Sequence, residues 1–166
     1  MSRRWIPYAT LLGAAVVQSL LPTSLFFGGA RWPLLTALTI YWALRLPRGR
    51  AMETALAAAV LHDALEPGGF GPALLVFPLL AWAANRCRGI VMAESLVAQL
   101  VFGGLGALAA TLGAISLHWI TGRRPLEVAP GFLRLLGSLP AGATALAAVS
   151  FFLRDRAARR REGRAW

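Results

Sequence analysis

The sequence is short of charge, of cysteine and of every basic residue except arginine. Only 14% of its 166 residues are charged, against about 25% in soluble domains, while 57% are hydrophobic. The mean hydropathy of +0.61 favours a membrane protein over a soluble domain. The single cysteine, Cys87, excludes an intrachain disulfide, and we expect it to have no special role.

Motifs for catalysis and metal binding are also missing. The sequence contains no HExxH, no Gly-Lys phosphate loop, no nucleophile elbow and no His/Cys cluster at metal spacing. Its two histidines, His62 and His118, are far apart in the chain. We therefore expect no enzymatic activity, no metal and no cofactor, and an intramembrane enzyme is the weakest alternative.

The net charge of +10 comes from arginine alone, because the sequence has no lysine. A charge of this size can indicate nucleic-acid binding. Here the arginines stand in short clusters between apolar runs, as cytoplasmic loops of membrane proteins do. The pattern thus predicts a membrane protein that binds no nucleic acid.

Six apolar runs predict an all-α integral membrane protein with about six transmembrane helices, formed as a single domain. The runs cover residues 5–27, 32–46, 51–65, 72–85, 90–120 and 132–153, followed by a basic tail over 154–166. The first run has no small-residue cleavage site, so we expect a retained anchor and not a signal peptide. The second to fourth runs are short for a span, and the tail is expected to fray or lie on lipid.

The distribution of arginine predicts the orientation. With the N-terminus inside and one crossing per run, most of the 17 arginines fall on the cytoplasmic side. Only four fall outside: Arg31, Arg123, Arg124 and Arg134. We therefore expect both termini inside and the turn between the third and fourth runs in the periplasm.

Small residues at four-residue spacing are candidate contact faces, because close backbone approach stabilises helix pairs in lipid. These ladders are Ala51, Ala55 and Ala59; Gly106, Ala110 and Ala114, beside Gly103, Ala107 and Thr111; and Ala141, Ala145 and Val149. Aromatic residues near run ends predict an interfacial belt: Trp32, Tyr41, Trp42, Trp82 and Trp119.

The central turn, residues 61–72, is polar and glycine-rich between two apolar runs. Its ionisable residues are His62, Asp63 and Glu66, and its glycines are Gly68, Gly69 and Gly71. Ionisable groups inside a membrane are functional candidates, and Glu94 and His118 also qualify. Glu53, Glu94 and Glu127 lie close to run ends, where they can reach water.

Asp63 is the strongest of these candidates. It lies in the last turn of the predicted third helix, where a carboxylate opposes the helix dipole and needs compensation. We favour hydrogen bonds from amides of the following turn. The alternatives are a cation or ligand, or a partner protein.

Two segments and the overall layout resemble the rod shape-determining MreD family. One segment is residues 38–47, with the pair Tyr41 and Trp42; the other is residues 60–71, with Asp63 between apolar residues before a glycine turn. The layout adds short middle helices and a basic tail. The sequence departs from the family pattern at His62.

The resemblance implies a non-enzymatic component of the bacterial inner membrane that supports lateral peptidoglycan synthesis during cell elongation. Its partners would be an MreC-like periplasmic protein, a RodA-type glycosyltransferase with its transpeptidase and, indirectly, MreB filaments. The family is also similar in fold to the S components of energy-coupling-factor transporters, so a vitamin-binding S component is the alternative. We expect Tyr41, Trp42, Asp63, Gly68, Gly69 and Gly71 to form structural or partner contacts, and the tail to bind anionic lipid.

Overall fold

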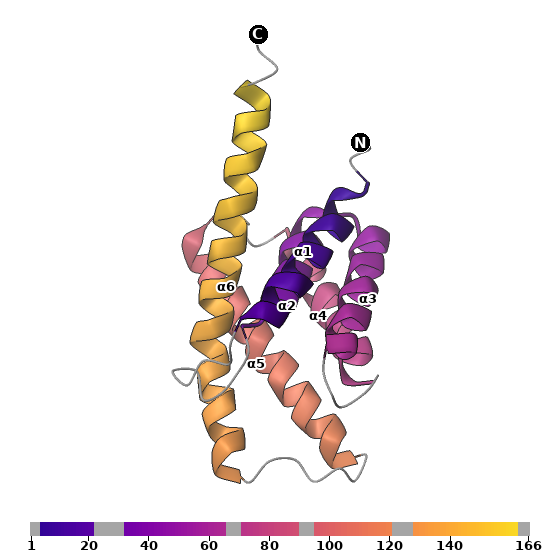
Figure 1. Cartoon of the computed structure of the whole chain (residues 1–166), viewed down its shortest axis with the longest axis vertical. Helices are drawn as coiled ribbons and strands as arrows, with labels where there is room; N and C mark the ends of the chain where they lie inside the picture. Colours follow the sequence, from indigo (N-terminus) through magenta and orange to yellow (C-terminus); the bar gives the residue numbers. More distant parts are fainter. Residues whose placement is uncertain (1–3, 22–31, 66–70, 90–94, 121–127, 163–166) are drawn as a thin grey trace.

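The computed structural model describes residues 4–21, 32–65, 71–89, 95–120 and 128–162, with side chains for all of these except 114, 117, 118, 128–130 and 154–162. All regular structure in these ranges is helical, which confirms the predicted all-α class. The helices are α1 (Ile6–Leu20), α2 (Leu34–Arg45), α3 (Arg48–Leu65), α4 (Pro72–Cys87), α5 (Leu96–Ile120) and α6 (Val128–Glu162) (Figure 1).

The helix bounds differ from the apolar runs mainly where polar residues continue a helix. Helix α3 begins at Arg48, before the apolar run, and α6 continues through the basic tail to Glu162. Arginine, alanine and glutamate are good helix formers, so loss of hydrophobicity does not end a helix. The tail is therefore a continuation of α6 as far as Glu162, where we had expected it to fray or lie on lipid.

Helix α2 forms the centre of the molecule. It packs against each of the other five helices, and residues 35–41 are buried around its whole circumference. A helix that is apolar on every side is expected in such a position. Burying Thr39 costs little, because its hydroxyl donates a hydrogen bond to the carbonyl of Leu35 within the same helix (2.8 Å).

Helix α3 uses alanine to approach its neighbours closely. Ala51, Ala55 and Ala59 are at most 1% exposed, as the four-residue ladder predicted, and Ala58 is also buried. The opposite side of the helix carries exposed apolar residues such as Leu56 and Val60. One side of α3 therefore packs in the protein, and the other is apolar and uncovered.

Helices α5 and α6 cross at a pair of glycines. A Cβ atom added at Gly103 would collide with the carbonyl oxygen of Gly142, and one added at Gly142 would collide with Gly103 and Ala107. Gly106, from the neighbouring ladder, instead faces Ile40 of α2. The small-residue prediction is confirmed at these positions, with two glycine-lined faces on one helix.

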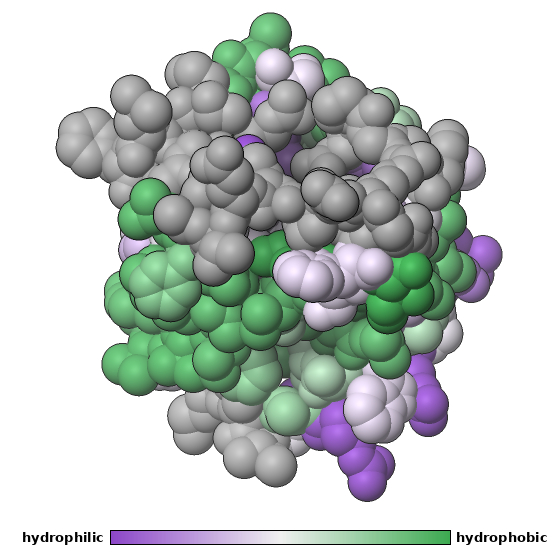
Figure 2. Space-filling model, turned by 90° about the horizontal axis from the view of Figure 1, so that it is seen from below, coloured by the Kyte–Doolittle hydropathy of each residue, from purple (hydrophilic) through white to green (hydrophobic). Residues whose placement is uncertain are grey.

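Among the described residues, two helical segments are long and apolar enough to cross a membrane: Leu96–Gly113 and Gly131–Leu153. Three others are apolar but shorter, namely α1, α2 and α4. In Figure 1, α5 and α6 extend beyond the shorter helices, and α6 ends on the same side of the molecule as α1 begins. Seen from below in Figure 2, the described residues form a broad hydrophobic band, with hydrophilic residues towards one side.

Candidate functional site

Asp63 lies at the end of α3 and binds the beginning of α4. One carboxylate oxygen accepts a hydrogen bond from the Gly71 amide (2.9 Å), and the other accepts one from the Ala73 amide (3.2 Å). Pro72, between them, has no N–H to satisfy. Asp63 is only 4% exposed, so both bonds form away from solvent. The carboxylate thus caps the first turn of α4 from another helix.

This geometry compensates the unfavourable interaction of the Asp63 carboxylate with the dipole of α3. The carboxylate opposes the C-terminal dipole of α3 but meets the positive N-terminal end of α4. Hydrogen bonds to a charged group contribute about 1.5–3 kcal/mol each, more than the dipole term of up to about 1 kcal/mol. The prediction that turn amides compensate Asp63 is confirmed.

Gly71 provides the backbone conformation that the cap requires. Its φ of 157° and ψ of −67° form a combination that L-residues rarely adopt. An added Cβ would meet nothing within 4 Å, so only the backbone angle restricts this position. The other predicted turn residues, Glu66, Gly68 and Gly69, lie outside the described residues.

His62 lies beside the cap without belonging to it. Its Nδ1 is 4.0 Å from the nearer oxygen of Asp63, beyond hydrogen-bond distance. Its ring packs edge-on against Phe77 of α4, with centroids 5.2 Å apart. His62 therefore contributes to the α3–α4 interface through a ring contact.

Tyr41 and Trp42 lie inside the helix bundle. Tyr41 is 5% exposed, and Trp42 donates its indole N–H to the hydroxyl of Thr10 on α1 (3.0 Å). The two rings form an edge-to-face pair with centroids 5.2 Å apart, and Arg45 lies 4.5 Å above the Tyr41 ring. Both residues therefore form structural contacts, as expected. Trp82 and Trp119 are 48% and 68% exposed, and the interfacial belt stays a prediction.

Two further helix ends are capped in the same way as α4, by side chains that the sequence analysis did not single out. Gln18 of α1 accepts a hydrogen bond from the Leu35 amide in the first turn of α2 (3.2 Å). Asn85 of α4 donates to the carbonyls of Ala43 and Leu46 at the other end of α2 (2.8 and 3.0 Å). The only signal in the sequence is a lone amide near each end of an apolar run.

The remaining candidates form no cluster. Glu53 is exposed and accepts a hydrogen bond from the Tyr8 hydroxyl (3.4 Å), and Cys87 is a half-buried thiol. Glu94 and Glu127 lie outside the described residues, as does the side chain of His118. Within the described part of the chain, no three His, Cys, Asp or Glu side chains are grouped as metal ligands.

Three polar side chains therefore form hydrogen bonds with backbone groups and join one helix to the end of another: those of Asp63, Gln18 and Asn85. Comparison with protein-family models, with curated proteins and with solved structures gives no match for this chain.

Proposed function

We propose that this chain is a membrane scaffold of the MreD type, acting in bacterial cell elongation. It would cross the inner membrane six times and bind an MreC-like periplasmic protein. Through that complex it would support a RodA-type glycosyltransferase and its transpeptidase, linked indirectly to MreB filaments. The observation that carries the proposal is the Asp63 cap. Asp63 lies in one of the two segments that resemble the MreD family, and its two hydrogen bonds join α3 to α4.

The shortest helix, α2, is compatible with six crossings because its ends find hydrogen-bond partners within the protein. Helix α2 has 12 residues, which span about 18 Å, whereas a hydrocarbon core is about 30 Å thick. Exposed helix ends are not tolerated at that depth unless the protein supplies hydrogen-bond partners. Gln18 and Asn85 supply them at the two ends of α2.

Three of the four arginine clusters assigned to the cytoplasm, all except the tail, lie close together in space, which supports the proposed orientation. Arg88 donates to the carbonyl of Leu46, so the end of α4 lies beside the end of α2 (3.0 Å). Arg4 and Arg50 line one pocket, so the start of α1 lies beside the start of α3. A single basic face is what the positive-inside rule requires of alternating crossings.

The outward surfaces fit lipid or another membrane span. Large apolar side chains are exposed along α1 and α4, including Leu12, Val16, Leu75 and Leu79. Trp82 is also exposed on α4. Apolar side chains directed outward suit hydrocarbon, and in an oligomeric complex the same faces can receive a partner helix.

Purification of the tagged full-length chain in mild detergent, with mass spectrometry of the proteins that co-purify, tests the proposal. We expect an MreC-like protein together with RodA-type enzymes. Recovery of transporter ATPase subunits would instead establish the S-component alternative, and recovery of neither group would contradict both. A Glu53→Gln variant is the matched control, because that exposed carboxylate lies at the other end of α3 from Asp63.

The Asp63→Asn variant sharpens the same experiment. If the cap shapes the partner surface, co-purification of the MreC-like protein should fall in Asp63→Asn and stay unchanged in Glu53→Gln. Equal recovery from both variants would place the contact elsewhere on the molecule.

A further inference from the structure

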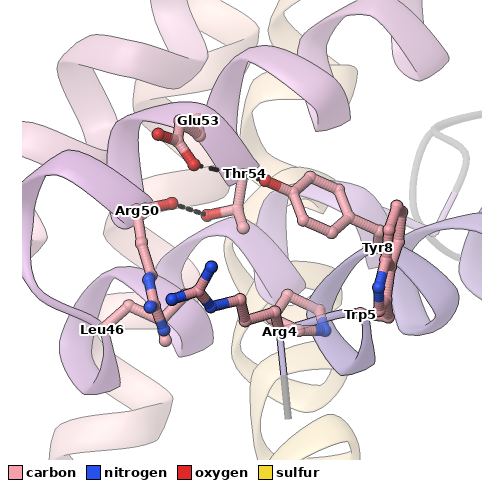
Figure 3. Close-up of a pocket in the computed structure, with 8 residues that line it drawn as sticks. Arg4, Trp5, Tyr8, Leu46, Arg50, Glu53 and Thr54 are labelled. Atoms are coloured by element: carbon pink, nitrogen blue, oxygen red, sulfur yellow. Dashed lines mark hydrogen bonds between the residues drawn. The ribbon is translucent and has the colours of Figure 1, made fainter. Parts of the chain in front are cut away.

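A basic pocket lies where the first turns of α1 and α3 meet, at the other end of α3 from the Asp63 cap. Its volume is about 550 Å³. It is lined by residues from the two helices and from the end of α2: Arg4, Trp5, Pro7, Tyr8, Leu46, Arg50, Glu53 and Thr54. Figure 3 shows these side chains surrounding a single opening.

The two arginines bring like charges together in this pocket. In Figure 3 the Arg4 side chain extends across the pocket towards that of Arg50. Among the described residues, neither guanidinium has a carboxylate within 4.0 Å. Glu53 is the only acid among the described residues that line the pocket, and it accepts a hydrogen bond from the Tyr8 hydroxyl (3.4 Å). Neither cation therefore forms an ion pair with a described residue, and two positive charges face the single negative charge of Glu53 in the pocket.

The backbone adds to this positive potential. Helices α1 and α3 both begin at the pocket, and the N-terminal end of a helix carries partial positive charge. The N-cap residue of α1, Trp5, makes no side-chain capping hydrogen bond. Two dipole ends and two guanidinium groups thus converge on the same space.

We propose that the pocket formed by Arg4 and Arg50 binds a phosphate group. Arginine presents several N–H donors in a planar fork that matches phosphate oxygens, and two such forks can hold opposite sides of the group. Trp5 is 64% exposed at the rim and packs edge-on against Tyr8, with ring centroids 6.3 Å apart. Tryptophan and tyrosine of this kind prefer the headgroup level of a bilayer. The phosphate belongs either to the headgroup of an acidic phospholipid or to a free anion.

Native mass spectrometry of the full chain in detergent, titrated with phosphatidylglycerol and with phosphatidylcholine, tests the site. The Arg4→Gln/Arg50→Gln double variant should bind phosphatidylglycerol about tenfold more weakly than the parent. Arg48→Gln/Arg86→Gln is the matched control: it removes the same two positive charges from exposed positions outside the pocket. Its effect should stay below about twofold.

The Glu53→Gln variant should change the affinity in the opposite direction, and it keeps both arginines. It removes the negative charge while leaving an oxygen that accepts from Tyr8, so affinity should rise about threefold. A parallel titration with inorganic phosphate separates the two sources. Arginine-dependent binding that is tighter for the lipid identifies a headgroup, and arginine-dependent binding of inorganic phosphate alone identifies the free anion.

Three results would overturn the proposal. The first is an equal loss in the control Arg48→Gln/Arg86→Gln and in the pocket variant Arg4→Gln/Arg50→Gln, which would mean that general surface charge attracts the anion. The second is unchanged or weaker binding in Glu53→Gln. The third is no dependence of either titration on Arg4 and Arg50.

Discussion

The region from α1 to α4 and the pair α5–α6 are held together by different kinds of contact. In the first region, polar side chains bond to the backbone at the ends of neighbouring helices, as Gln18, Asp63 and Asn85 do. In the second, the helices cross where two glycines, Gly103 and Gly142, leave no room for a side chain. In the first region, hydrogen bonds at helix ends therefore add to the side-chain packing, whereas α5 and α6 are joined by close packing along the helices.

Helix length accounts for the difference. Helix α5 has 25 residues and spans about 38 Å, so its ends can reach water on both sides of a bilayer. The 12 residues of α2 cannot, so its terminal amides and carbonyls need partners inside the protein. In the proposed membrane setting, a short helix therefore needs neighbouring helices to supply hydrogen-bond partners for its ends. A long helix needs its neighbours only for packing along its surface.

Asp63→Ala should have the largest effect on the region of capped helices. It removes both acceptors from the first turn of α4 and leaves buried amides unpaired, which should lower the free energy of unfolding by about 3 kcal/mol. The measurement is unfolding by sodium dodecyl sulfate in mixed micelles, followed by tryptophan fluorescence. Glu53→Ala, an exposed carboxylate on the same helix, should change it by less than about 0.5 kcal/mol. If both variants lower the free energy of unfolding by similar amounts, the Asp63 hydrogen bonds do not contribute specifically to stability.

Gly142→Ala should have the next largest effect, on the glycine-packed pair. The added methyl group would collide with Gly103 and Ala107, and separating the helices should cost about 2 kcal/mol. Gly131→Ala on the same helix meets nothing within 4 Å and should be neutral or stabilising by about 0.5 kcal/mol. The same unfolding measurement compares the two. If both alanines are tolerated equally, close approach is not what joins α5 to α6.

The contacts differ in how far the sequence predicted them, and the difference follows their separation in the chain. Small residues repeat along one helix, so the ladders at Ala51 and Gly103 were visible as a pattern before the structure. The Asp63 cap was predicted because donor and acceptor lie close in the chain. The bond from Asn85 to Ala43 joins residues 42 positions apart, and no local pattern indicates it. The phosphate pocket was missed for the same reason, since Arg4 and Arg50 meet only in three dimensions.

Asn85→Leu tests a cap that the sequence did not reveal. Leucine is similar in size but cannot donate to the carbonyls of Ala43 and Leu46, so the free energy of unfolding should fall by about 1–2 kcal/mol. Arg88 still donates to Leu46, which limits the loss. Gln18→Leu, at the other end of α2, should cost about 1 kcal/mol. Because the two sites share no partner, their effects should add in the double variant, and strong non-additivity would mean that α2 responds as one unit.

Gly71→Ala should have the smallest effect, and it separates the shape of the turn from its hydrogen bonds. Space is available for the methyl group, so the expected cost of about 1 kcal/mol comes from the backbone angles alone. Gly13→Ala, within α1 and also in open space, should instead be stabilising by about 0.5 kcal/mol, because alanine favours the helix. Chemical denaturation of both variants in the same detergent gives the comparison. If Gly71→Ala matches the parent, the Gly71 backbone can relax to ordinary angles while its amide stays bonded to Asp63. The cap would then depend on the carboxylate and not on glycine.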